Sequence, residues 1–279
     1  MSLIKFIRFD IKNGIMRRLY VYLIYSLFIV VSVYFFQGKL HSYEIEKHSI
    51  GDCLLFLYGG AKEYVPKTGE VFEMPYLWLV NHLLILYFTL NYTDNDLTGF
   101  GQQLIYRSGG RVIWWLSKCI WNIIMVSGFY IIGIIITLLL GINNAEFTLD
   151  ISEHISYVVN FGDQLKQNHT QKIALEILLL PILYSVAISL LQMSLTLLFK
   201  PIFSYIVSSS ICLSSAYKLT PILIGNFSMA ARNDKIVNNG VSSALGIISF
   251  SIIIILSVII GVLIIRKCNI LNKEWIICQ

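Results

Sequence analysis

The sequence predicts an all-α integral membrane protein with six transmembrane helices, and three observations support this prediction. Of the 279 residues, 56% are hydrophobic and only 13% are charged, whereas soluble domains carry about 25% charged residues. The apolar residues occur in long runs, several of them near the roughly 20 residues that a helix needs to cross a hydrocarbon core. The runs also lack the alternating pattern of a transmembrane barrel, which leaves helices as the structure that satisfies the backbone in lipid.

An amphipathic in-plane helix is expected before the first span, over residues 2–18. Lys5, Arg8 and Lys12 are three and four residues apart and therefore share one helical face, while aliphatic residues line another. This pattern is typical of a helix that lies in the membrane interface with its basic face toward the lipid headgroups. A basic flank that only fixes the topology is the alternative interpretation.

Six apolar segments are expected to be spans: residues 19–36, 74–90, 120–140, 173–198, 202–216 and 244–265. The second is short and polar in places, and the fifth is short and rich in serine. The segments 37–73 and 141–172 are expected to be external loops, each too short to fold alone. Residues 1–279 therefore form a single transmembrane domain.

The positions of lysine and arginine set the expected orientation. Most of the 21 lie in the N-terminus, the 91–119 loop, the turn near Lys200 and the C-terminal tail, which are short segments. The longer loops on the other side carry most of the acidic residues. Because positive residues concentrate on the cytoplasmic side, both termini are expected in the cytoplasm.

The sequence carries no motif for catalysis or for nucleotide binding. The patterns GxxxxGK[ST], GxSxG and HExxH are absent, and the five histidines lack the spacing of metal ligands. We therefore expect no enzymatic activity and no cofactor or metal bound by this chain. A sequence pI near 8.8 in a membrane protein requires no nucleic-acid partner, and none is expected.

The stretch after the second span predicts a short cytoplasmic helix. Asp94 and Asp96 precede it and Arg107 lies toward its end, an order that suits the helix dipole. Such a helix is able to dock into a soluble partner, whereas a plain connecting loop is the alternative. The residues expected to contact that partner are Leu97, Phe100, Gln103, Leu104, Tyr106 and Arg107.

Polar residues inside the apolar runs are candidates for a substrate path. His82, Gln192, Ser208 and Ser209 are placed either to line such a path or, as the more ordinary reading, to bond neighbouring helices and allow close packing.

Two charged residues lie near the outer ends of neighbouring spans. Glu176 is near the outer end of the fourth span and Lys218 near that of the fifth, and the turn at Lys200 makes these spans antiparallel. The two charges are therefore able to form an intramembrane ion pair, or to reach the outer interface separately.

The layout resembles the permease subunits of type-2 ABC exporters, of the kind associated with bacterial peptide or bacteriocin export or immunity. The resemblance covers nearly the whole chain. It is carried by LIYRSGGR at 104–111 with WWLSK at 114–118, and by SAY at 215–217, Pro221, GNFSM at 225–229 and Arg232.

This resemblance implies an exporter in the bacterial cytoplasmic membrane that moves a peptide or another amphipathic substrate. A separate ABC-type ATPase subunit would bind ATP and Mg and would dock on the 97–106 helix, the counterpart of the family's coupling helix between spans two and three. A second permease copy or a related permease is implied, with the path between the two lined by the second and fifth helices.

Two other functions stay open from the residues alone. An ion-coupled secondary transporter would be expected to show ionisable residues near mid-membrane and two related halves, and neither is clear here. A non-transporting membrane sensor or assembly subunit would carry its information in the external loops.

Overall fold

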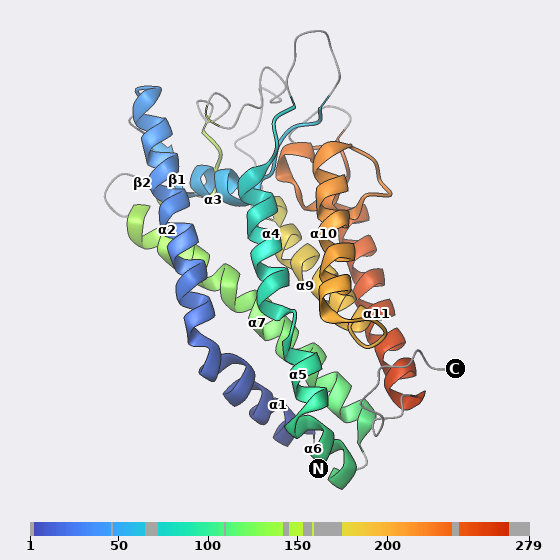
Figure 1. The fold of residues 1–279 in the computed structure, drawn as a ribbon. Helices are drawn as coiled ribbons and strands as arrows, with labels where there is room; N and C mark the ends of the chain where they lie inside the picture. The colour runs from blue at the N-terminus through green and yellow to red at the C-terminus, as the bar shows by residue number, and fades with distance from the viewer. Residues whose placement is uncertain are drawn as a thin grey trace.

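The computed structural model describes residues 3–45, 47–64, 72–108, 110–141, 145–152, 158, 175–235 and 240–267. Its long helices lie side by side, with α7 (Arg111–Gly141) crossing them obliquely (Figure 1). Within these described ranges, four helical segments are long and apolar enough to cross a membrane: Leu3–Ser42, Arg111–Gly141, Glu176–Leu195 and Ser243–Lys267. The chain is therefore a helical membrane protein, as the sequence predicts.

The N-terminal segment bends before the first long helix. Helix α1 (Leu3–Asp10) continues through a π-helical turn at Ile11–Ile15 and a 3₁₀ turn at Met16–Arg18 into α2 (Leu19–Ser42). Gly14 lies in this bend, where a Cβ atom would come within 2.3 Å of the Trp121 indole nitrogen. Glycine is therefore required for the bend to approach α7.

The segment 37–73 contains the end of α2 and a buried helix, so the prediction of a loop over this whole range is wrong. Helix α2 runs on to Ser42, and α3 (Ile50–Tyr58) is buried along its whole length. A capping box starts α3: Ser49 accepts from the Asp52 backbone nitrogen at 3.0 Å, and Asp52 accepts from the Ser49 nitrogen at 2.9 Å. Glycines are typical of loops, but Gly51 and Gly59 lie at the two ends of this helix.

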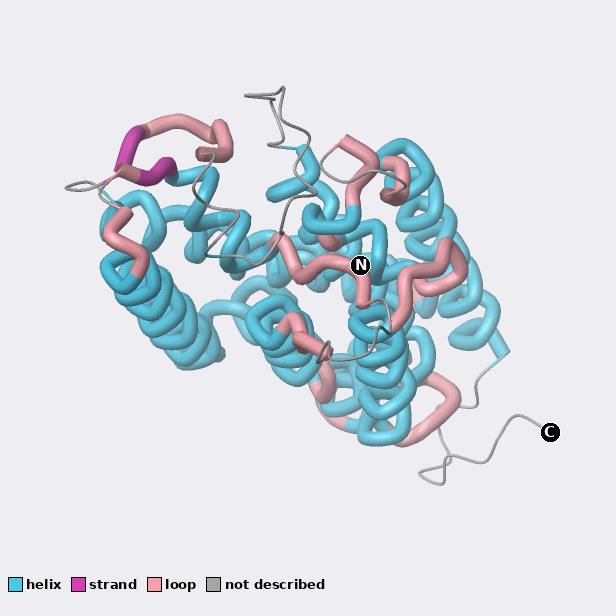
Figure 2. The backbone as a smooth tube through the Cα atoms, turned by 90° about the horizontal axis from the view of Figure 1, so that it is seen from above, coloured by secondary structure: helices cyan, strands magenta, loops and turns pink. Residues whose placement is uncertain are grey.

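Two short strands lie beside α3. Strand β1 (His48–Ser49) pairs in parallel with β2 (Ala145–Glu146), at one edge of the helical bundle (Figure 2). This pairing joins the segment that follows α2 to the segment that follows α7.

The middle of the chain forms α4 (Tyr76–Thr89), α5 (Tyr92–Thr98), α6 (Phe100–Ser108) and α7 (Arg111–Gly141). Helix α6 ends and α7 begins on either side of the glycine pair 109–110, and adjacent glycines disfavour a continuous helix. Helix α7 begins at Arg111, whereas the third span is predicted from the sequence to begin at residue 120. The preceding segment, which includes Lys118, is therefore the first part of a continuous helix and not a loop.

The last third of the chain begins with a π-helical turn at Leu175–Leu179 that leads into α9 (Leu180–Leu195). Helix α10 (Pro201–Tyr217) follows, then 3₁₀ turns at Ile224–Ser228 and Ala230–Arg232, and then α11 (Ser243–Lys267). Helix α11 packs along α9, and α10 packs against α4 and α9. Each of the six predicted spans thus falls on a helix.

A tryptophan of α7 fixes the position of α11. The Trp115 indole donates a hydrogen bond to the Val258 carbonyl of α11 at 3.0 Å. Gly261, one turn further, leaves room for the indole, since a Cβ atom there would lie 2.1 Å from two of its ring carbons. Close approach of two helices at a small residue is the usual way in which membrane helices pack.

Substituting Gly261→Val is expected to lower the free energy of unfolding by about 1–3 kcal/mol, because overpacking displaces the Trp115 indole. Thermal unfolding in detergent, followed by circular dichroism, measures this. Gly38→Val is the matched control, because nothing lies within 4 Å of a Cβ atom at that helical glycine. Equal stabilities of the two variants would contradict the packing argument.

Candidate functional site

A buried lysine joins three segments that are far apart in the sequence. Lys118 of α7 contacts the Asp10 carboxylate of α1, and its Nζ lies 2.6 Å from an oxygen of Asp96 in α5. Asp10 and Lys118 are buried, and the Asp96 side chain is only 8% exposed. We call these residues the Lys118 network.

Aromatic side chains complete the Lys118 network. The Tyr92 hydroxyl donates to Asp10 at 2.8 Å, and the Trp114 indole donates to Asp96 at 2.8 Å. The Lys118 Nζ lies 4.8 Å from the centre of the Tyr92 ring, within cation–π range. Burial, and next the charge of Asp10, raise the pKa of Tyr92 far above its ordinary value, so its hydroxyl keeps its proton and donates.

The network holds one end of the molecule together. Figure 1 shows α1, α5, α6 and the start of α7 at the same end. Stacking of the Phe9 and Phe100 rings, with centroids 5.4 Å apart, adds a direct contact between α1 and α6. We call residues 3–18, 92–108 and 110–121 the basal unit. Burying one cation between two carboxylates with further donors makes the unit costly to take apart.

The basal unit exposes some of the predicted docking residues and buries others. Phe100 is 54% exposed and Gln103 is also exposed, so α6 presents both to solvent. Leu97 is buried in the apolar core and Leu104 is half-buried against it. Leu97 therefore anchors α5 and is not available to a partner, which corrects the prediction for that residue. The side chains of Tyr106 and Arg107 lie outside the described residues.

Two of the predicted path residues connect α4 to its neighbours. The Nδ1 atom of His82 lies 2.6 Å from the Trp78 carbonyl, and the His82 ring packs against Tyr184 of α9. The Gln192 amide donates to the Leu86 carbonyl at 2.9 Å. Among the described residues, His82 Nε2 and Gln192 Oε1 have no hydrogen-bond partner, although both side chains are buried.

The two predicted serines of α10 differ in burial and in hydrogen bonding. Ser208 is buried and its hydroxyl has no partner in the described part of the chain. Ser209 is half-buried and donates to the Ile206 carbonyl of its own helix at 3.0 Å. Ser208 therefore faces the interior of the bundle, as His82 and Gln192 do, whereas Ser209 is partly exposed.

Glu176 forms an ion pair, but its partner is not Lys218. Glu176 Oε1 lies 2.6 Å from Lys235 Nζ and accepts from the Ser243 hydroxyl at 2.8 Å, whereas the Lys218 side chain is exposed. The predicted pair is wrong because the chain after α10 folds back and carries Lys235, not Lys218, over the start of α9.

Arg232 organises that returning segment. Its guanidinium donates to the Ser215 and Ala216 carbonyls at the end of α10 at 2.6 and 2.7 Å, to the Ala61 carbonyl at 3.0 Å, and to the side chain of Asn226. Burial lowers the pKa of Arg232 to about 10, which leaves it charged at neutral pH. A cation that caps the last carbonyls of a helix also complements the negative end of its dipole.

Asp10 and Lys118 are not among the site residues predicted from the sequence, although the position of Asp10 is unusual. It is the one acidic residue in the basic segment 2–18, and a lone acid on such a helix favours a specific partner. Lys118 gave no comparable signal, because it was expected in a cytoplasmic loop that favours lysine in general.

Comparison with known proteins gives a family but no activity. A family model described as a protein of unknown function (DUF2705) matches residues 67–271. No curated protein and no solved structure matches the chain. The matched range includes Asp96 and Lys118, whereas Asp10 precedes it.

Substituting Lys118→Met is expected to cost about 3–5 kcal/mol of stability, because it leaves two buried carboxylates without their cation. Thermal unfolding in detergent measures the loss, and faster proteolysis of the N-terminal segment reports release of α1. Lys5→Met, on the exposed face of α1, is the control and is expected to change stability by less than about 0.5 kcal/mol. A loss of similar size in both variants would show that the network contributes nothing specific.

Substituting Arg232→Lys is expected to cost about 2 kcal/mol or more, because an ammonium group keeps the charge but cannot reach all four acceptors. Unfolding by heat is again the measurement. Arg8→Lys, on the exposed face of α1, makes the same chemical change without those acceptors. If Arg232→Lys unfolds like Arg8→Lys, the carbonyl contacts are not stabilising.

Proposed function

The chain belongs to the DUF2705 family of proteins of unknown function, and from that premise we propose that it is the membrane-spanning permease subunit of an ATP-driven ABC exporter. It moves a peptide or another amphipathic substrate and is powered by a separate ATPase subunit, which binds ATP and Mg. It lies in the bacterial cytoplasmic membrane with six spans and both termini in the cytoplasm.

The basal unit is the observation that carries this proposal. Two short helices, α5 and α6, stand between α4 and α7. Buried charges join α5 to α1 through Lys118, and the stacking of Phe9 and Phe100 joins α6 to α1. From this unit α7 runs without a break for 31 residues, about 46 Å, to the other end of the bundle. A partner that moves the basal unit would therefore move a continuous helix that contacts α2, α9 and α11.

Positive charge supports the placement of the basal unit in the cytoplasm. Arg17 and Arg18 precede α2, Arg111 begins α7, and Arg266 and Lys267 end α11. Arg111 also donates to the Arg266 carbonyl at 3.1 Å, so these two charged ends are adjacent. This is the arrangement that the preference for lysine and arginine on the cytoplasmic side favours.

Helices α4 and α10 complete the six spans of the proposal. They have 14 and 17 residues, at or below the practical minimum of about 17 for a span. Figure 1 shows both parallel to the longer helices and level with them, and α10 packs against both α4 and α9. Partners inside the bundle thus cover part of each short helix.

The same two helices face outward with apolar side chains. Tyr87 of α4 is 60% exposed and Ile206 of α10 is 53% exposed, with Phe203 at 50%. This favours a second permease copy, or a related permease, on the α4–α10 side, with the substrate path between the two. Ser209 lies on this outward side of α10 and is able to line the path directly. The buried residues His82, Gln192 and Ser208 would line it only if α4, α9 and α10 separate.

Affinity purification from native membranes in mild detergent, followed by mass spectrometry, is expected to recover a P-loop ATPase in near-equal amount. Phe100→Glu should abolish that recovery, because it places a charge on the exposed face of α6. Phe147→Glu is the matched control, since Phe147 is 64% exposed near β2 at the other end of the molecule. Recovery of the chain alone, in several detergents, would overturn the proposal.

A further inference from the structure

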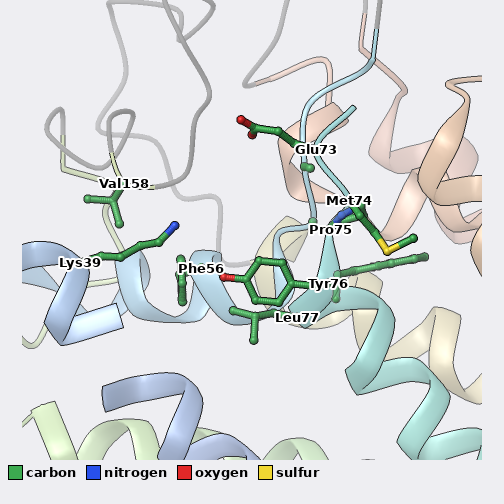
Figure 3. Close-up of a pocket in the computed structure, with 11 residues that line it drawn as sticks. Lys39, Phe56, Glu73, Met74, Pro75, Tyr76, Leu77 and Val158 are labelled. Atoms are coloured by element: carbon green, nitrogen blue, oxygen red, sulfur yellow. The ribbon is translucent and has the colours of Figure 1, made fainter. Parts of the chain in front are cut away.

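A small cavity lies between α2, α3 and the start of α4, away from the basal unit. It has a volume of about 80 Å³. Figure 3 shows Phe56, Leu77 and Met74 along its walls, with Lys39 on the left and Glu73 above. The cavity thus combines an apolar lining with one cation and one carboxylate.

Lys39 is held at this cavity by aromatic rings. Its side chain is half-buried, and the ammonium lies 5.5 Å from the centre of the Phe35 ring and 5.4 Å from that of Phe56. Among the described residues, Lys39 forms no ion pair. Cation–π contacts place an ammonium but leave its hydrogen-bond donors available to an acceptor.

The position of Lys39 along α2 sets its depth in the membrane. It follows Arg18 by 21 residues, which is about 31 Å of helix, close to the thickness of about 30 Å of the hydrocarbon core. Leu23, Leu27 and Val31 are exposed between these two cations. Lys39 therefore lies at the headgroup level of the leaflet opposite the basal unit, where lipid phosphates lie.

Exposed aromatic residues mark the same level. Phe35 is 48% exposed and Tyr76 is 46% exposed, and their rings contact each other with centroids 6.3 Å apart. Aromatic side chains of this kind gather at the membrane–water interface. The cavity, which Tyr76 also lines, is therefore adjacent to lipid.

We propose that this cavity binds the headgroup of a membrane phospholipid, with the phosphate on the Lys39 ammonium and a hydrogen-bond donor of the headgroup directed to the Glu73 carboxylate. The volume suits a headgroup and is well below the roughly 300 Å³ of a pocket for a drug-sized ligand. The acyl chains lie along the exposed apolar face of α2. Phosphatidylglycerol and phosphatidylethanolamine supply such a donor, whereas phosphatidylcholine does not. The site is independent of the proposed transport function.

Thermal unfolding of the purified full chain in detergent, with one added lipid at a time, tests this proposal. Phosphatidylglycerol and phosphatidylethanolamine are each expected to raise the apparent Tm by about 5 °C at a hundredfold excess over Kd, and phosphatidylcholine by much less. Glycerol 1-phosphate at the same concentration carries the phosphate without the acyl chains, and it is expected to give no shift.

Variants of Lys39 test whether lipid binding occurs at this cavity. Lys39→Gln is expected to weaken retention of both lipids about tenfold or more, measured by native mass spectrometry, because it removes a charge-assisted hydrogen bond, while Lys39→Arg retains them. Lys218→Gln, an exposed lysine at the end of α10, should behave like the unmodified chain.

Three results would overturn the proposal. An equal rise in Tm with phosphatidylcholine would show that the cavity does not distinguish headgroups. An equal rise with glycerol 1-phosphate would show that the site binds a phosphate group without the acyl chains. Equal losses in Lys39→Gln and Lys218→Gln would show that any interfacial lysine has the same effect.

Discussion

The arrangement of this protein depends on one buried cation between two carboxylates. A lysine and two aspartates removed from water would each be costly alone, so Asp10, Asp96 and Lys118 are stable only when all three meet. Their meeting fixes the direction of α1, the place of α5 and the start of α7. Gly14 and Trp121 then set how closely the bend after α1 approaches α7.

At the end opposite the basal unit, buried charged side chains again hold separate segments together. There α10 ends, and the last carbonyls of the helix would lack donors. Arg232 supplies several donors at once to α10 and to Ala61, while Glu176 joins Lys235 and Ser243 at the start of α9. Charged side chains thus close both ends of the bundle, where backbone groups must find partners within the protein.

The sequence predicts the helices well because long apolar runs have few alternatives in lipid, and the break before Arg111 follows from two adjacent glycines. Burial and pairing were less predictable, for physical reasons. The buried helix α3 is shorter than a span and is flanked by glycines, so it resembles a loop. The partner of Glu176 depends on how residues 218–243 fold back, which no periodicity encodes. Leu97 shows the same limit, because an apolar residue on a short helix fits a docking face as well as a core.

The Lys118 network also has a consequence for biosynthesis. Asp10 and Lys118 are 108 positions apart, and at about 5–20 residues per second the ribosome needs about 5–20 seconds to make the intervening chain. During that interval Asp10 has no counter-ion from α7, and burying its charge alone would be costly. The packing of α1 against α7 therefore has to follow the synthesis of α7, so the most N-terminal helix is among the last to take its place in the bundle.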